Sequence, residues 1–231
     1  MTAFVHRAAG WLVVLTLAGA ALMWWAARWK PDRAEYPSQG VSISAANGAV
    51  AWGSVKAAGA DFAYLAATDG ARGRDQHFAA NRDGAAAQGI RSGAVHRYRL
   101  CAFAADQAAN FIRNVPRNPA ALPPAVWLDL DADCGTAPSR ALLLSELTTF
   151  LAQIEAHMGK RSIIAPSAAF DAEYDVSNGI ARTTWVRGFF FEPDYGAHDW
   201  TMWQANDYAR ISGAAGTVGW NVVRGGGDGG E

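Results

Sequence analysis

Three aspartates stand at alternate positions near the middle of the chain, within the run from Leu122 to Cys134. The run begins with two prolines, continues as an apolar segment of strand length and ends in Asp129, Asp131 and Asp133. Because side chains alternate across a strand, Asp129 and Asp131 would share one face, about 6.6 Å apart along an extended chain. Such a carboxyl pair could act in acid–base chemistry. The alternative, which we favour for Asp131 and Asp133, is that they are solvated turn or cap residues.

The position of these acids is informative as well as their spacing. The segment that carries them is apolar enough to be a buried strand, with Trp127 on the same face as Asp129. Acids at the C-terminal end of a buried strand stand where α/β barrels hold their reactive groups. The rest of the chain must therefore supply a sheet that can position this end.

Apolar runs of strand length alternate with amphipathic segments through most of the chain. Strands are expected at residues 41–44, 62–66, 92–97, 125–129, 162–165, 184–187, 201–204 and 217–220. Helices are expected at residues 52–58, 76–88, 104–114, 140–158 and 168–174. Strands that alternate with helices predict an α/β fold with a parallel sheet. The helices fade after about residue 175, so the last strands should be joined by loops.

The helix at residues 140–158 has the clearest pattern. Ser139 is a suitable N-cap and Gly159 a suitable terminator. Its apolar residues form one stripe at helical spacing, namely Leu143, Leu147, Phe150, Leu151, Ile154 and Met158.

The N-terminal segment predicts a membrane anchor. Residues 8–27 carry no charge and are long enough to cross a bilayer as a helix. Trp24, Trp25 and Trp29 at its C-terminal end suit a membrane interface. The alternative is a cleavable signal peptide, whose apolar core is usually shorter. We expect an anchor at residues 1–30, a polar linker at 31–39, one globular domain at 40–224 and a disordered glycine-rich tail at 225–231.

Composition limits the classes of function. The chain has 231 residues and a formal net charge of −1, with 51% hydrophobic residues. This is enough for one sizeable core, and the near-neutral charge gives no nucleic-acid footprint. The five histidines and two cysteines show no metal-ligand spacing. We therefore expect neither a nucleic-acid partner, nor a metal, nor another cofactor.

Many short motifs together resemble the glycoside hydrolase family 25 lysozymes, which cleave peptidoglycan. The resemblance runs from Gly40 to about Gly225, and the order and spacing of the motifs carry it. They include residues 40–44, 58–64, 67–70, 93–96, 107–111, 123–134, 185–187, 199–204 and 218–221, with Gly48, Trp52, Asp75, Phe78 and Asn81. The resemblance implies a single-domain, irregular TIM-like (β/α) barrel behind an N-terminal transmembrane helix.

The chain departs from the family pattern at its acids. The family's Asp-x-Glu aligns with Trp127 and Asp129, its first-strand aspartate with Ser42 and its late aspartate with Gly219. The glutamate after the second strand aligns with Asp69, and a tyrosine usual on the fifth strand aligns with Ala165. The resemblance thus implies that Asp129 stands in the proton donor's place, although its side chain is one methylene shorter. Asp131 and Asp69 are further candidate acids.

Several polar and aromatic residues are candidates for binding a glycan. Aromatic rings offer large flat apolar faces for stacking on sugars, and the alternative for each ring is a place in the barrel core. By strand-end or family position, the candidates are Trp127, Tyr98, Trp185, Trp203, Gln204 and Asn221. His96 is a lone histidine at a strand end, and we expect a hydrogen-bonded structural group rather than a base.

Cys101 and Cys134 follow neighbouring strands of the expected barrel, so both should lie at one end of it. A disulfide is geometrically reasonable, and cysteines at similar places pair in some relatives; two separate buried thiols are the alternative. A disulfide would indicate an oxidising compartment. The basic residues after the apolar segment outnumber Arg7 before it, which would put the domain in the cytoplasm. The resemblance implies the periplasmic side of a bacterial inner membrane instead, and we follow it.

Two functions remain open at this stage. One is a divergent lysozyme that cleaves the β-1,4 bond between N-acetylmuramic acid and N-acetylglucosamine through Asp129. The other is an inactive pseudo-lysozyme that binds cell-wall glycan or an unknown partner protein at the membrane. Because Ser42, Trp127 and Gly219 replace carboxylates, we expect weak or no hydrolysis.

Overall fold

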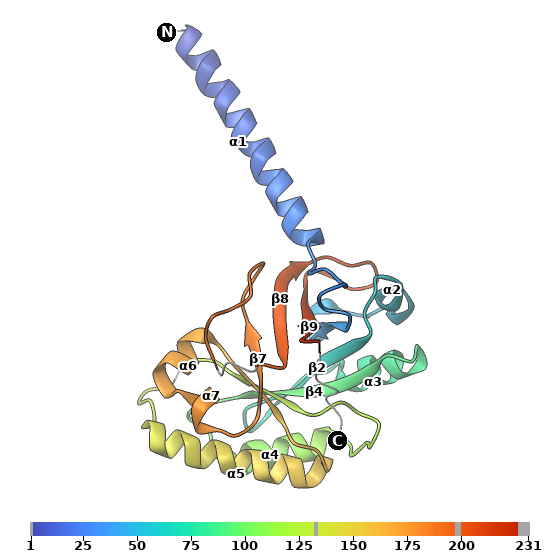
Figure 1. The fold of residues 1–231 in the computed structure, drawn as a ribbon, viewed down its shortest axis with the longest axis vertical. Helices are drawn as coiled ribbons and strands as arrows, with labels where there is room; N and C mark the ends of the chain where they lie inside the picture. The colour runs from blue at the N-terminus through green and yellow to red at the C-terminus, as the bar shows by residue number, and fades with distance from the viewer. Residues whose placement is uncertain (1, 132–133, 197–199, 226–231) are drawn as a thin grey trace.

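A closed barrel of eight strands forms the body of the protein, and one long helix projects from it (Figure 1). The computed structural model describes residues 2–131, 134–196 and 200–225. Asp133 and residues 226–231 of the expected tail lie outside the described residues.

The strands follow the predicted order with small changes in their ends. They are β1 (Gln39–Ile43), β2 (Phe62–Asp69), β3 (Gly73–Arg74), β4 (Arg91–Tyr98), β5 (Ala125–Leu128), β6 (Ile163–Pro166), β7 (Thr183–Arg187), β8 (Met202–Ala209) and β9 (Val218–Val223). β3 is a two-residue addition that pairs with the end of β2 and was not predicted. β8 and β9 continue beyond the predicted bounds because they pair with each other as a hairpin.

The barrel closes through β1. The sheet order is β1-β9-β8-β7-β6-β5-β4-β2, and β1 also pairs with β2 in parallel. β9 is antiparallel to both of its neighbours, so the sheet is not the all-parallel one that the alternating pattern predicted. The short connection between β8 and β9 explains this, because parallel strands need a longer crossover.

The helices on the barrel exterior are α2 (Trp52–Ala57), α3 (Phe78–Ala87), α4 (Ala104–Asn114), α5 (Arg140–Met158), α6 (Ala168–Tyr174) and α7 (Val176–Gly179). A short 3-10 helix follows β1 at Ala45–Asn47. In α5, Ser139 accepts a hydrogen bond from the amide of Leu142, and Gly159 ends the helix in the left-handed conformation. The six residues of the predicted stripe are the buried ones.

Two apolar clusters stabilise the barrel. The larger one lies between the strands and the surrounding helices. The smaller one fills the barrel interior and is built from Phe62, Tyr64, Val95, Ala125, Ile163, Ala165, Trp185 and Met202, with Trp127 packed against it. Glycine makes room for its rings, since a Cβ on Gly93 would stand 2.4 Å from the ring of Tyr64. The interior is therefore a packed floor rather than an open channel.

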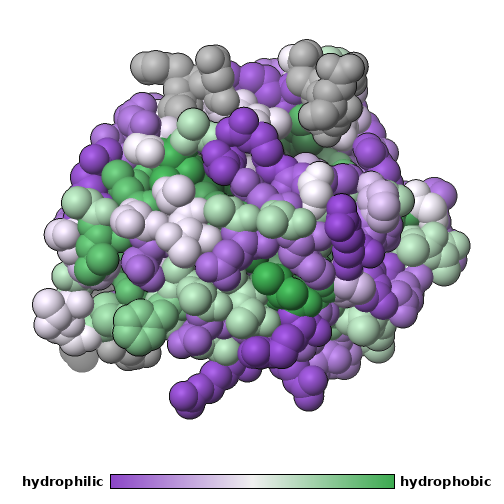
Figure 2. All heavy atoms as spheres, turned by 90° about the horizontal axis from the view of Figure 1, so that it is seen from below, coloured by the Kyte–Doolittle hydropathy of each residue, from purple (hydrophilic) through white to green (hydrophobic). Residues whose placement is uncertain are grey.

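Helix α1 (Thr2–Arg28) extends away from the barrel and meets it only at its C-terminal end (Figure 1). The stretch Gly10–Arg28 has a mean hydropathy of 1.7 and is long and apolar enough to cross a membrane. On the face of the barrel away from α1, hydrophilic and hydrophobic residues are interspersed (Figure 2). The long run of exposed apolar side chains belongs to α1, which includes Trp11, Leu12, Leu15 and Leu17.

Cys101 and Cys134 form a disulfide, as predicted, with 5.5 Å between their Cα atoms. The bridge joins the segment after β4 to the segment after β5, close to Asp129 and Asp131. It links two segments that are far apart in the sequence. A cross-link of this kind stabilises a protein mainly by restricting its unfolded chain.

We predict that removing the disulfide by the double substitution Cys101→Ser and Cys134→Ser lowers the free energy of unfolding by about 3 kcal/mol, since the closed loop spans 33 residues. Thermal unfolding of the full chain in detergent, followed by circular dichroism with and without a reductant, measures this. The reductant should destabilise the natural chain and leave the double variant unchanged. Equal responses of the two proteins would contradict the prediction.

Candidate functional site

The candidate site lies at the barrel mouth, which we define as the end at which the parallel strands terminate. Strand register sets its residues side by side. Arg97 on β4 pairs with Trp127 on β5, and Arg187 on β7 pairs with Gln204 on β8. Gln204 in turn pairs with Asn221 on β9. These positions alternate with outward-facing residues, so their side chains share the inner face of the sheet.

Asp129, the predicted proton donor, lies at this mouth directly after β5 and is held by arginines. One carboxylate oxygen accepts a hydrogen bond from Nη2 of Arg187, and the other lies 3.9 Å from Nη2 of Arg97. The guanidinium of Arg187 also lies over the ring of Trp127, 5.1 Å from its centroid. Both oxygens of Asp129 thus face positive charge, whereas a general acid must aim an O–H at the leaving oxygen.

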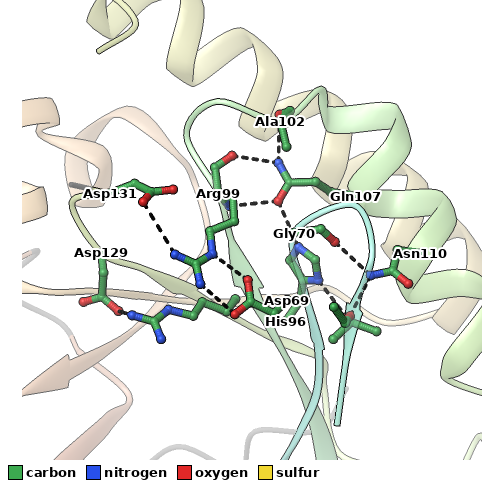
Figure 3. A network of polar contacts seen from close by, with 12 residues as sticks. Asp69, Gly70, His96, Arg99, Ala102, Gln107, Asn110, Asp129 and Asp131 are labelled. Atoms are coloured by element: carbon green, nitrogen blue, oxygen red, sulfur yellow. Dashed lines mark hydrogen bonds and ion pairs between the residues drawn. The ribbon is translucent and has the colours of Figure 1, made fainter. Parts of the chain in front are cut away.

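The two other candidate acids share one arginine (Figure 3). Asp69, at the end of β2, receives two hydrogen bonds from Arg99, at 2.5 Å from Nε and 2.8 Å from Nη2. Nη1 of Arg99 lies 3.5 Å from a carboxylate oxygen of Asp131. The Asp131 side chain is only 12% exposed, so the solvated-turn alternative does not describe it. The structure brings Asp69 and Asp131 together as one ion-pair cluster beside Asp129.

A buried amide positions this cluster. Gln107 on α4 accepts from the backbone amide of Arg99 at 2.8 Å, and its Nε2 donates to the carbonyl oxygens of Arg99 and Ala102 (Figure 3). Asn110, one turn further along α4, donates to the carbonyls of Gly70 and Gly73 at 2.9 Å each. The helix α4 therefore holds both chain segments that carry Asp69 and Arg99.

The three other positions expected from the resemblance to align with family acids carry no carboxylate, and each has another structural role. Oγ of Ser42 accepts from Nδ2 of Asn221 at 2.9 Å. A Cβ on Gly219 would stand 3.1 Å from Cβ of Ser42 and 3.2 Å from Nε2 of Gln204. Trp127 fills its position with an indole that packs edge-on against Trp185, 5.9 Å between centroids. A carboxylate at residue 219 would require the Gln204 side chain to move.

Unpartnered polar atoms gather on the barrel's inner face. Among the described residues, seven buried side-chain polar atoms have no hydrogen-bond partner, and five are on inward-facing residues of the barrel. Three are donors and two are acceptors, namely Nε1 of Trp127, Nε1 of Trp185, Nε of Arg187, Oε1 of Gln204 and Oδ1 of Asn221. Buried polar groups are normally paired, and these five atoms are covered by the packing of the inner face, so they form no contact surface for a ligand.

Two predicted glycan-binding residues do not lie at the mouth. Tyr98 is buried outside the barrel, with its ring 5.4 Å from that of Phe150 on α5. Trp203 also faces outward, where it donates from Nε1 to the carbonyl of Gly188 at 2.6 Å and packs against Trp29. Both are core residues in the structure. Trp127 and Trp185 are in the interior, and Gln204 and Asn221 are at the mouth.

Asp207 is a site residue that sequence reasoning missed. Its carboxylate accepts from Nε2 of Gln204 at 2.9 Å. Removal of water from around it raises the pKa of Asp207, against the opposing effects of Arg187 and Gln204. A β-bulge shifts the register between Gln204 and Asn206 and turns Asp207 to the side of Gln204. Regular alternation would have placed it on the opposite face.

Arg97 and Arg187 were also missed, although a signal for them existed. Both stand at the C-terminal ends of predicted strands. Each is two positions after an inward-facing residue, Val95 or Trp185, so it faces the same side of the sheet. A search for charges opposite to the aspartates at these ends would have found them.

An eight-stranded barrel with polar residues at the ends of its strands is an architecture that many hydrolases share. The sequence of this chain identifies the family within that class. The family model for glycosyl hydrolases family 25 matches residues 41–214. The chain therefore belongs to glycosyl hydrolase family 25.

The most informative relatives are lysozymes and related hydrolases. Lysozyme M1 of Streptomyces globisporus is 29% identical over 201 residues, which cover 81% of this chain and 68% of that protein. The crystal structure of a bacterial lysozyme from Streptomyces coelicolor matches with a TM-score of 0.75 and 29% identity, over 81% of this chain and 92% of the other. A family 25 glycosyl hydrolase from Bacillus anthracis matches with a TM-score of 0.76 and 28% identity, over 86% and 93%.

His96 is a hydrogen-bonded structural residue, in line with the sequence expectation. Its Nδ1 lies 2.8 Å from Oγ1 of Thr68, and its Nε2 lies 3.2 Å from Oε1 of Gln107. Burial lowers the pKa of His96 to about 4, and the hydrogen bond with Gln107 opposes this shift. The imidazole is therefore neutral in the folded protein at neutral pH.

We predict that His96 makes the protein less stable in mild acid. The unfolded chain takes up the proton near pH 6.5 and the folded protein only near pH 4, so the free energy of unfolding falls as the pH drops between these values. By about pH 5 the loss should be about 2 kcal/mol. Denaturant unfolding at about pH 7.5 and about pH 5 measures it, with His96→Gln as the control that lacks this dependence. Identical pH dependences would contradict the prediction.

Proposed function

We propose that this protein is a membrane-anchored binder of cell-wall glycan, built on a lysozyme barrel whose acid set is degenerate. The observation that carries the proposal is the partly exposed rim of the barrel mouth, where the guanidinium of Arg187 lies over the ring of Trp127 and the side chains of Arg97 and Asp129 keep exposed surface. N-acetylated sugars of peptidoglycan carry hydroxyl and amide groups that would hydrogen-bond to the guanidinium donors and carboxylate acceptors of this rim. The partly exposed indole of Trp127 would stack on a sugar face.

The arrangement of the acids argues against efficient hydrolysis. A glycosidase usually needs two carboxyl groups on opposite sides of the scissile bond. Here Ser42, Trp127 and Gly219 stand at the aligned acid positions. Asp129 is paired with Arg187 and Arg97. Its side chain is one methylene shorter than that of glutamate, and a displacement of the carboxyl group by about 1 Å can lower the rate about 10²-fold.

A divergent muramidase is the second candidate function, and Asp207 is the observation that favours it. Its raised pKa and its place beside Gln204 give the mouth a further carboxyl group that is easier to protonate. In that case Asp129 or Asp207 would be the proton donor at the bond between N-acetylmuramic acid and N-acetylglucosamine. The substrate's own N-acetyl group would supply the nucleophile that the missing carboxylate does not.

The location that we propose is a bacterial inner membrane, crossed once by α1, with the barrel at residues 40–224 on the outer side and residues 31–39 as the linker. The disulfide supports an oxidising compartment, and the wall is the substrate that the family implies.

The basic residues after α1 have structural partners. Lys30 lies 3.5 Å above the ring of Trp220 and donates to the carbonyl of Ala58, while Arg33 pairs with Asp61 at 3.1 Å. Their excess over Arg7 is thus explained by the fold. A cleaved signal peptide is the alternative for α1.

We predict that the purified full chain sediments with peptidoglycan sacculi and does not clear them. Arg97→Ala should weaken binding by roughly 10-fold or more, because a hydrogen bond from a charged group contributes about 1.5–3 kcal/mol. Arg91→Ala, at an exposed arginine at the opposite end of β4, should leave binding unchanged. Co-sedimentation and turbidity of the same suspension give both readouts.

The variant Asp129→Asn separates the two candidates. If the protein is a binder, this variant keeps its affinity for sacculi, apart from the small change expected from one lost ion pair. Clearing by the natural chain that disappears in Asp129→Asn would establish the muramidase and overturn the proposal. Binding that is the same in Arg97→Ala and the natural chain would show that the mouth is not the glycan site.

A further inference from the structure

Aromatic side chains from three parts of the chain meet where α1 joins the barrel. We call them the aromatic collar: Trp24 and Trp25 of α1, Phe189, Phe190 and Phe191 after β7, and Tyr208 of β8. The ring of Phe190 lies 5.1 Å from that of Trp25 and is stacked on Tyr208 at 6.2 Å, with an interplanar angle of 8°. Phe189 contacts Tyr208 edge-on at 5.6 Å. The collar thus joins the apolar helix to the end of β8.

The junction is fixed by hydrogen bonds to backbone carbonyl groups as well as by rings. Nδ2 of Asn206 donates to the carbonyl oxygens of Ala26 at 2.7 Å and Trp29 at 2.9 Å. The amide of Arg210 donates to the carbonyl of Ala27 at 2.9 Å. These bonds satisfy carbonyl groups that the helix end leaves without partners. The direction of α1 relative to the barrel is therefore set by the fold.

The segment that carries the three phenylalanines is held in an unfavourable conformation. Phe190 has a φ of 69°, in the left-handed region that non-glycine residues avoid. Its amide donates to the carbonyl of Ala205 at 2.8 Å, and Glu192 just beyond it accepts from Nε1 of Trp200 at 3.0 Å. A strained residue persists only where its surroundings fix it. Here the surroundings present the neighbouring Phe191 outward.

Much of the collar is exposed although it is aromatic. Phe191 is 80% exposed, Tyr208 51% and Trp24 63%. Exposed apolar patches of this kind mark interaction sites, and this one is continuous with the apolar surface of α1. Tryptophan and tyrosine, which the collar supplies as Trp24, Trp25 and Tyr208, concentrate at the headgroup level of membranes. Arg28, with its guanidinium 4.8 Å from the Trp24 ring, adds a cation that suits lipid phosphates.

The collar is also adjacent to the candidate site. Residues 188–191 follow Arg187 directly, and the amide of Gly188 donates to the carbonyl of Gln204 at 3.2 Å. The strand β8 carries Gln204 toward the mouth and then meets α1 through Asn206. The side of the mouth formed by β7 and β8 is thus the side nearest to α1 (Figure 1).

We propose that the aromatic collar lies in the headgroup region of the bilayer that α1 crosses, and that it holds the β7–β8 side of the barrel mouth at the membrane surface. The inference rests on the proposed anchoring by α1. The lipid surface is the partner, and the glycan that reaches the mouth is then one located at the membrane, such as a strand still attached to its lipid carrier. A flexible tether would give the mouth no such preference.

The test places a photo-reactive p-benzoylphenylalanine at single positions of the full chain in vesicles of phosphatidylethanolamine and phosphatidylglycerol. Phe191→p-benzoylphenylalanine probes the collar and closely resembles the natural ring. Leu17, exposed in the middle of α1, reports the anchor. Leu142 is a matched exposed apolar residue. It belongs to α5, which lies on the side of the barrel away from α1 (Figure 1). Mass spectrometry after irradiation detects lipid adducts.

We expect lipid adducts at positions 17 and 191 and no adducts at position 142. Adducts at 17 without adducts at 191 would overturn the collar contact and leave the anchor standing. No adducts at 17 would overturn the anchor and the inference together. Equal yields at 191 and 142 would also overturn the inference, because lipid would then be meeting the barrel without preference for the collar.

Discussion

Closure of the barrel through β1 is the constraint on which the site depends. This strand pairs in parallel with β2 and antiparallel with β9, so it brings the first and last parts of the chain together. Ser42 thereby lies opposite Gly219 and accepts a hydrogen bond from Asn221. Because β9 also pairs with β8, the same closure sets Gln204 beside these residues. A sheet left open at β1 would separate the two halves of the mouth.

Arginine–aspartate pairing governs the charge within this frame. Each of the three candidate acids predicted from the sequence faces a guanidinium, with Arg187 and Arg97 at Asp129 and Arg99 between Asp69 and Asp131. Such pairing with several hydrogen bonds fixes side-chain geometry. The mouth therefore offers a rigid and nearly charge-balanced rim, so the proposed recognition of a glycan would not depend on attraction of a charged polymer.

The sequence predicted the elements well and the faces of the strands less well. Helix α5 agrees residue for residue because a cap, a terminator and an apolar stripe all indicate the same bounds. Barrel strands are apolar on both faces, so periodicity could not tell that Tyr98 and Trp203 point outward while Trp185 points inward. Asp207 depended on a bulge, and bulges leave no reliable pattern in a single sequence. β9 is antiparallel because it forms a hairpin with β8. The sequence indicated only that no helix joins these two strands.

The buried inner face of the mouth and its exposed rim have different roles. A buried polar group without a partner costs about 1–3 kcal/mol, and five such atoms share the inner face. The amides of Gln204 and Asn221 offset part of this cost, because they donate to Asp207 and Ser42. Apolar replacements at either position would remove these hydrogen bonds. The inner face therefore positions the mouth, and any contact with a ligand falls to rim residues that keep exposed surface, such as Arg97 and Asp129.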